Sequence, residues 1–200
     1  MTDCQKKFRE RAMRLKRALG NEQRKNGFIN DGAGKRYEIG PLFVLAGELQ
    51  KALDFFAWYE KFCAEDIGEP LHSLFWALAF YRTGDHEAAN TKLLETMVQN
   101  VYFLPTLLGS PPAPYDMWHS SNHEDPGYFA DMPEEYIPEL SGEERSWIKS
   151  QLGSFRFRRV LDEYVSTFHK LKTERNFEKR SRILDQWREF LSGKILMNPW

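Results

Sequence analysis

Two segments of this chain repeat one pattern of small and large residues at a fixed offset. Gly47 of AGELQKALDFF, residues 46–56, aligns with Gly84 of TGDHEAANTKL, residues 83–93, which is an offset of 37 residues. In both segments a small residue stands seven positions before the glycine, and an aromatic residue stands four before it. Glycine ends a helix by adopting the left-handed conformation, and small residues let two helix axes approach. The pattern therefore predicts two helical hairpins that turn at Gly47 and Gly84.

This pattern resembles the tetratricopeptide repeat, a helix–turn–helix unit of about 34 residues. The residues at the family's consensus places are Ile39, Gly40, Phe43, Gly47, Ala52 and Phe56 in the first unit and Trp76, Ala77, Phe80, Gly84, Ala89 and Leu93 in the second. The resemblance covers residues 35–100. It departs from the family in its longer spacing, in lacking the final proline of each unit, and in Pro41. Because proline is tolerated best in the first turn of a helix, we expect the first helix to begin near Ile39.

The resemblance implies a curved scaffold that holds a protein or peptide partner on its concave face. The residues placed on that face are apolar, namely Tyr37, Val44, Leu71, Leu74, Leu78 and Tyr81. The Lys, Asn and Arg residues with which the family binds a terminal carboxylate are absent from this set. The face therefore takes either a hydrophobic segment of a partner or the chain's own C-terminal helices. Large apolar patches are uncommon on soluble monomers, which favours the chain's own helices.

The remaining segments complete a single all-α domain over residues 1–200. Residues 1–25 form a basic N-terminal helix, whose apolar stripe is Phe8, Ala12, Leu15 and Leu19. Residues 110–140 form an irregular excursion that is rich in proline and acidic residues, and its aromatic residues suggest that it packs on the protein. Residues 141–193 form C-terminal helices, the first of which begins with a capping box made by Ser141 and Glu144.

Composition favours a folded protein in a reducing compartment. The chain has 200 residues, of which 42% are hydrophobic, and its only cysteines are Cys4 and Cys63. They form no CxxC pair, which argues against a disulfide framework or a zinc finger. No apolar run is long enough to cross a membrane, and the N-terminus lacks the apolar stretch of a signal peptide. We expect a cytoplasmic protein with no membrane partner.

A nucleic-acid-associated protein is the first alternative function. The net charge of −1 conceals two basic ends and an acidic middle. The basic residues of the N-terminal helix, which could bind phosphates, are Lys6, Lys7, Arg9, Arg11, Arg14, Lys16 and Arg17. These basic residues are spread around the helix and do not form one surface. The aromatic residues fall on apolar stripes, where packing explains them better than base stacking does. Docking of the basic ends on the acidic middle explains the charges better than a nucleic-acid partner does.

A metal-dependent enzyme is the second alternative. His119 and His123 would share one face of a helix and, with Glu124 or Asp125, could bind a metal ion. The sequence HEDPG is typical of a turn, however, and the chain has no phosphate-loop or nucleophile motif. We therefore expect no cofactor and no enzymatic activity. The main prediction is non-enzymatic recognition of another protein.

Overall fold

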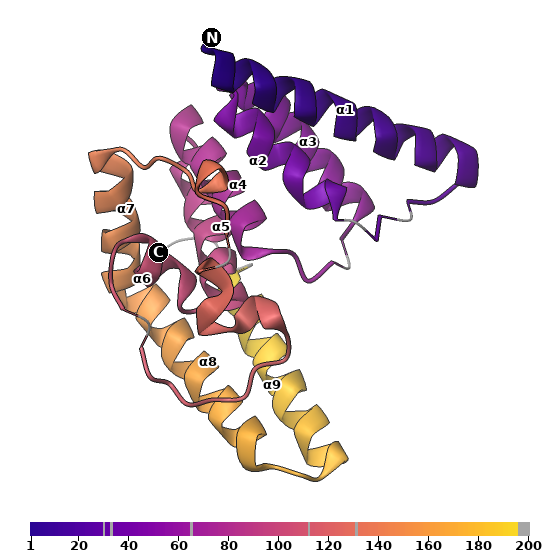
Figure 1. The fold of residues 1–200 in the computed structure, drawn as a ribbon. Coiled ribbons are helices and arrows are strands. Elements are labelled where there is room, and N and C mark those ends of the chain that lie inside the picture. Colours follow the sequence, from indigo (N-terminus) through magenta and orange to yellow (C-terminus); the bar gives the residue numbers. More distant parts are fainter. Residues whose placement is uncertain (30, 33, 65, 112, 131, 196–200) are drawn as a thin grey trace. The chain divides into compact units, whose positions relative to one another are not determined.

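The computed structural model describes residues 1–29, 31–32, 34–64, 66–111, 113–130 and 132–195. These residues contain helices and no strand, which confirms the predicted all-α class (Figure 1). The helices are α1 (Asp3–Asn26), α2 (Lys35–Leu45), α3 (Leu49–Phe62), α4 (Pro70–Thr83), α5 (His86–Gln99), α6 (Phe103–Leu107), α7 (Gly142–Gly153), α8 (Phe155–Thr173) and α9 (Phe177–Ile195), with short 3-10 helices η1 (Asn122–Glu124), η2 (Pro126–Phe129) and η3 (Glu134–Tyr136).

The chain divides into two compact units. Unit 1 comprises Met1–Lys92 and Pro133–Pro138, and unit 2 comprises Leu93–Met132 and Glu139–Trp200. Helix α5 begins in unit 1 and ends in unit 2. The single domain expected for residues 1–200 stays a prediction.

The two predicted turns are both present and have the same hydrogen-bond geometry. Gly47 and Gly84 have φ angles of 76° and 87°, in the left-handed region that glycine adopts without steric cost. In each turn the amide after the glycine donates to the carbonyl of the aromatic residue five positions earlier. These bonds run from Glu48 to Phe43 at 2.9 Å and from Asp85 to Phe80 at 3.0 Å. The repeated pattern in the sequence therefore corresponds to one helix-ending turn used twice.

Gly40 lets α2 and α3 pack at close range. A Cβ atom placed on Gly40 would lie 2.2 Å from Cε1 of Phe56, so the Phe56 ring occupies the space that a side chain at residue 40 would need. The same ring stacks on Trp76 of α4, with ring centroids 5.0 Å apart and an interplanar angle of 7°. The absent side chain of Gly40 thus allows Phe56 to join three helices.

Substitution of Gly40 by alanine tests this packing. We expect Gly40→Ala to lower the free energy of unfolding by about 1–3 kcal/mol, because the added methyl group overpacks the site against Phe56. Gly20→Ala is the matched control, since Gly20 lies inside α1 and nothing stands within 4 Å of its added Cβ. The control should raise the free energy of unfolding by about 0.5–1 kcal/mol through helix propensity. Urea titration followed by circular dichroism measures both, and equal effects of the two substitutions would contradict the packing.

Helix α2 begins at Lys35, so the expected start near Ile39 is wrong. The carboxylate of Asp31 accepts hydrogen bonds from the backbone amides of Lys35 and Arg36, at 3.0 and 2.7 Å. Amide groups of the first turn have no partner within a helix, and a carboxylate that accepts from them stabilises the helix start. Asp31 therefore starts the helix early and leaves Pro41 inside it.

A histidine from α4 compensates for the proline in α2. Pro41 has no amide hydrogen, so the carbonyl of Tyr37, four residues earlier, lacks its usual helical donor. Nδ1 of His72 lies 3.1 Å from that carbonyl oxygen. Because a carbonyl can only accept, the proton of the neutral imidazole is on Nδ1. His72 thus replaces the hydrogen bond that Pro41 cannot make, and it joins α4 to α2.

A double-mutant cycle tests this replacement. We expect His72→Leu to lower the free energy of unfolding by about 1–3 kcal/mol more in the natural sequence than in a Pro41→Ala background. In that background the amide of residue 41 can satisfy the Tyr37 carbonyl, and the histidine is no longer required for it. Chemical denaturation of the four proteins gives the coupling energy. An equal cost of His72→Leu in both backgrounds would show that the histidine stabilises by packing alone.

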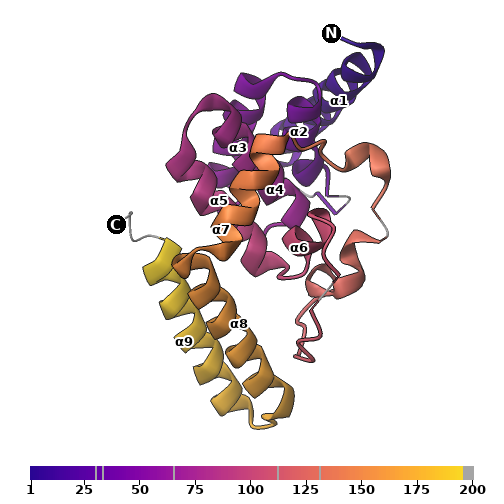
Figure 2. The ribbon, with the colours of Figure 1, turned by 90° about the vertical axis from the view of Figure 1, so that its left-hand side faces the viewer.

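Unit 2 contains the three C-terminal helices. The predicted capping box starts α7, where the Ser141 hydroxyl accepts from the Glu144 amide at 3.1 Å and the Glu144 carboxylate accepts from the Ser141 amide at 2.8 Å. Helices α8 and α9 lie side by side as an antiparallel pair (Figures 1 and 2). Tyr164 contacts both helices of this pair. Its ring centroid lies 4.2 Å from that of Phe168 on α8 and 5.5 Å from that of Trp187 on α9. The buried apolar residues of α8, which are Phe157, Val160, Tyr164, Phe168 and Leu171, recur every three or four positions, so one face of the helix packs on the core.

The excursion is fastened to unit 2 by the side chain of Asn100. This buried amide donates to the carbonyls of His123 and Asp125, at 2.7 and 3.1 Å. Its oxygen accepts from the amides of Tyr102 and Phe103, at 2.9 and 3.0 Å. Aromatic contacts add to this attachment, including those of Tyr115 with Tyr102, Trp118 with Phe168, and Tyr128 and Phe129 with Phe103. The prediction that the aromatic residues of the excursion pack is confirmed.

Candidate functional site

The six residues predicted to line a partner-binding face have unequal exposure. Val44, Leu74 and Leu78 are buried in the core. The other three, Tyr37, Leu71 and Tyr81, are half-buried. The buried side chains could reach a partner only if the protein opened, so half of the predicted set does not belong to an accessible surface.

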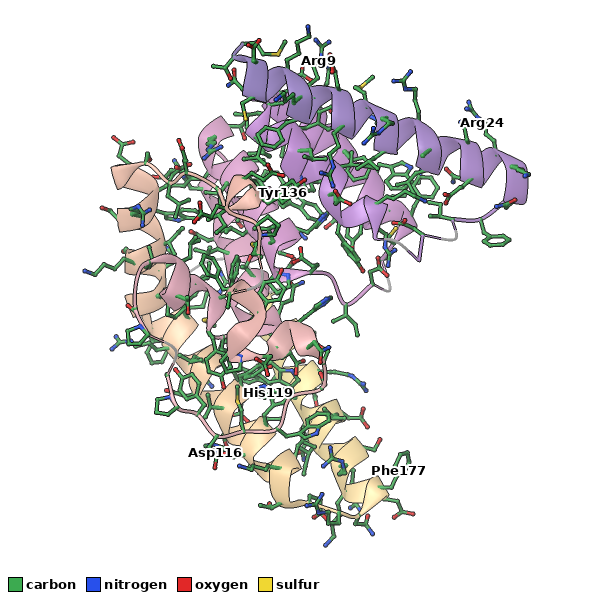
Figure 3. All side chains as sticks on the ribbon, in the orientation of Figure 1. Arg9, Arg24, Asp116, His119, Tyr136 and Phe177 are labelled. Atoms are coloured by element: carbon green, nitrogen blue, oxygen red, sulfur yellow. The ribbon has the colours of Figure 1, made fainter. Side chains whose placement is uncertain are left out.

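A pocket of about 600 Å³ lies where α1 and α3 end in unit 1. Its lining comes from the end of α1, from the segment that joins α1 to α2, and from the segment that joins α3 to α4. The lining residues include Gln23, Phe28, Ile29, Arg36, Phe62 and Asp66. Arg24, at the same end of α1, is labelled in Figure 3. The pocket therefore joins two connecting segments that are 30 or more residues apart in the sequence.

The polar groups at this pocket are bonded to one another. Arg36 donates to Asp66 at 2.6 and 3.3 Å, to the carbonyl and carboxylate oxygens of Asp31 at 3.0 and 3.4 Å, and to the Tyr37 hydroxyl at 3.0 Å. These bonds use all five N–H groups of a guanidinium. Asp66 also accepts from the Tyr59 hydroxyl at 3.2 Å. A ligand anion would find no free donor on Arg36.

The pKa values follow from this network. The hydrogen bonds to Asp66 raise the pKa of Arg36 further above its ordinary value. Burial pushes the pKa of Asp66 up, but the hydrogen bonds and charge of Arg36 outweigh burial and hold that pKa below its ordinary value. Burial also raises the pKa of Tyr59. Both members of the ion pair therefore stay charged, and the tyrosine stays neutral, near pH 7.

Large apolar side chains remain exposed in the lining of the pocket and at the residue that follows Asp66. Phe28 is 62% exposed and Phe62 is 50% exposed, and both line the pocket. Ile67, one residue after Asp66, is 90% exposed. The ring of Phe62 stacks on Trp58 with centroids 5.5 Å apart, which orients it on the surface of α3. We call Phe28, Phe62 and Ile67 the apolar rim.

The sequence contains only a weak signal for the apolar rim. Phe62 follows Phe55 and Tyr59 at the spacing of the buried stripe of α3, which predicts that Phe62 is buried as well. The end of the helix at Phe62 leaves that side chain exposed instead. Phe28 and Ile67 lie in connecting segments, in which no periodic pattern predicts exposure. Phe28 and Phe62 meet at one pocket because of how α1, α2 and α3 pack.

The basic residues of α1 are divided between ion pairs and solvent (Figure 3). Arg9 pairs with Glu48 at 3.1 Å, and Arg11 pairs with Glu38 at 2.5 Å and also contacts the Tyr136 hydroxyl. Ala12 and Leu19 of the predicted apolar stripe are buried. The other basic residues predicted to contact phosphates, Lys6, Lys7, Arg14, Lys16 and Arg17, are exposed. Arg9 and Arg11 therefore form ion pairs with acidic residues, as expected if the basic N-terminal helix docks on the acidic middle of the chain.

The histidines of the proposed metal site do not share a helix face. His123 lies in η1, whereas His119 precedes it and packs its ring against Tyr102 at 5.8 Å (Figure 3). His123 is exposed beside Tyr128, with ring centroids 5.9 Å apart. Across the part of the chain that the structure describes, no three His, Cys, Asp or Glu side chains gather in a group that could hold a metal ion. Both histidines therefore help to hold the irregular excursion in place, His119 through its ring contact with Tyr102 and His123 through its carbonyl, which accepts from Asn100.

His72 is a buried titratable residue that packs against Tyr37 and Tyr59 of this network. Its ring lies within 6.1 Å of the rings of Tyr37, Phe56, Tyr59 and Trp76. Burial lowers the pKa of His72 from 6.5 to about 4, so the imidazole is neutral at pH 7. Burial has the opposite effect on Glu69 at the start of α4, where it raises the pKa to about 7.

The stability of the protein should respond to pH through His72. Between pH 6.5 and pH 4 the unfolded chain binds a proton at this residue and the folded chain does not, so the free energy of unfolding falls as pH falls. Relative to His72→Leu, we expect the natural protein to lose on the order of 3 kcal/mol over this range. Glu69 titrates in both proteins, so the difference between their urea-denaturation profiles isolates the histidine. Parallel pH profiles would contradict the assignment.

Comparisons with known proteins found no match to a family model, to a curated protein or to a solved structure. Membership of the tetratricopeptide family therefore stays a prediction. Among the described residues, no helix combines the length and apolarity that crossing a membrane requires.

Proposed function

We propose that unit 1 recognises an apolar segment of another protein at its pocket and apolar rim, without catalysing a reaction. The observation that carries this proposal is the combination of satisfied polar groups and exposed apolar ones. Arg36 has all its donors occupied, whereas Phe28 and Phe62 remain largely in contact with water. Covering such side chains is favourable by about 25 cal/mol per Å² of apolar surface.

The mode of binding follows from the shape and rigidity of the site. A large apolar side chain of the partner would enter the pocket and would contact Phe28 and Phe62 on its way in. Aromatic residues around a pocket are typical of the centres of protein interfaces, where a few contacts supply most of the binding energy. The two hairpins hold the connecting segments in place, in the manner proposed from the resemblance to helical repeats. The half-buried Tyr37 of the originally predicted face contacts Arg36 beside this pocket.

Charged substitutions on the rim test the proposal. We expect Phe62→Asp to weaken capture of the partner from a lysate of the native host by tenfold or more, in line with the roughly 2 kcal/mol typical of a central interface residue. Phe177→Asp is the matched control, because Phe177 is an 84% exposed phenylalanine in unit 2. Quantitative mass spectrometry of the captured proteins compares the variants, and circular dichroism verifies their folding.

A second variant separates this surface from the face predicted by sequence. Leu74→Asp should unfold unit 1, because Leu74 is fully buried. Should Phe62→Asp retain every partner that the natural protein captures, the apolar rim is not the recognition site. Should Leu74→Asp stay folded and lose the partner, the originally predicted face is used instead.

A further inference from the structure

One face of α8 in unit 2 is hollowed along most of its length. A pocket of about 640 Å³ lies beside Phe155, Arg159 and Glu163, and a second, of about 490 Å³, lies beside Leu161, Val165 and His169. Asp162 and Ser166 line both pockets, which therefore adjoin. The face is about 20 Å long at the rise of an α-helix.

The second pocket has a wall that is attached to α8. Tyr115 of the excursion lines it. The Tyr115 carbonyl contacts Nε2 of His169, and the next residue, Asp116, forms an ion pair with Lys172 (Figure 3 labels Asp116). The pocket is thus built from two segments, and its side walls, Leu161 and Val165, are apolar and half-buried.

The first pocket carries a protruding aromatic side chain and unpaired charges. Phe155 is 75% exposed. No ion pair is formed, among the described residues, by the charged side chains of this pocket, which are Arg158, Arg159, Asp162 and Glu163. Positive and negative side chains nevertheless lie within two turns of the helix. The first turn of α8 contains no acidic residue, so no carboxylate there offsets the positive end of the helix dipole, and the Arg159 guanidinium lies over the Phe190 ring, 5.9 Å from its centroid. An acidic group supplied from outside would stabilise this end of the helix.

We infer that α8 is the interface of a symmetric dimer, in which the Phe155 ring of each copy enters the Tyr115–Val165–His169 pocket of the other. A twofold axis at the level of Leu161 runs the two helices antiparallel and places residue 155 at the level of Val165, Ser166 and His169, which line the second pocket. The same axis places Arg159 opposite Glu163. A twofold interface must be complementary to itself, and this face supplies both the projecting ring and the pocket, and both signs of charge.

This interface lies in unit 2 and does not depend on the function proposed for unit 1. A contact made by one face of a helix is at the small end of protein interfaces, so we expect weak self-association that depends on protein concentration. Sedimentation velocity of the full chain from about 1 to 200 µM should show a monomer that becomes a dimer as concentration rises. A protein that remains monomeric at the highest concentration overturns the inference.

Substitutions identify the surface. Phe155→Asp should weaken self-association by about tenfold or more, whereas Phe177→Asp, which changes an equally exposed phenylalanine on α9, should leave it unchanged. A dimer that tolerates Phe155→Asp, or that is lost on Phe177→Asp, uses another face. Circular dichroism verifies that both variants are folded.

A charge exchange tests the antiparallel register independently of Phe155. Arg159→Glu and Glu163→Arg should each weaken self-association, because each places two like charges opposite each other. An equimolar mixture of these two variants should regain association. In the mixed dimer one contact joins Glu at position 159 to Arg at position 163, and the other contact keeps the natural pair of Arg159 with Glu163. Failure of the mixture to associate more strongly than either variant alone overturns the proposed register.

Discussion

The hydrogen bond between His72 and the Tyr37 carbonyl is the contact on which the arrangement of unit 1 depends. Pro41 inside α2 leaves a buried backbone acceptor without its helical donor, which is costly away from water. Helix α4 supplies the missing donor from a side chain at 3.1 Å. The bond therefore restores α2 and also sets the position of α4 relative to it. The aromatic rings packed around His72 exclude water from this bond.

The polar groups beside this core are satisfied within the protein, and this restricts what the surface of unit 1 can bind. Arg36 is surrounded by Asp31, Asp66 and Tyr37, so its charge is used to join the two connecting segments. A binding site for an anion or a catalytic proton acceptor needs a free polar group. The pocket offers apolar contact instead, at Phe28 and Phe62. Unit 2 differs, because the face of α8 combines an exposed ring with charged side chains that form no ion pair among the described residues.

Local features were predictable wherever the signal depends on neighbouring residues. The turns at Gly47 and Gly84, the capping box at Ser141 and the stripe of α8 all follow from the spacing of a few residues. The start of α2 was not predictable in this way, because Asp31 caps the helix from outside its periodic segment. The role of His72 was also hidden, since its partner is 35 residues away in the sequence. A long-range contact of that kind leaves no local pattern.

The amino-acid sequence by itself determined the all-α class, the turns at Gly47 and Gly84 and the capped start of α7, because helix propensity, capping and apolar periodicity act within a few turns. Only the tertiary structure decided which apolar residues remain in contact with water. Leu74 and Phe62 both stand on apolar helix faces, yet the first is fully buried and the second is half exposed. The difference depends on where neighbouring helices end, and packing between distant segments sets that. The candidate surfaces of this protein are therefore products of its fold and not of any motif.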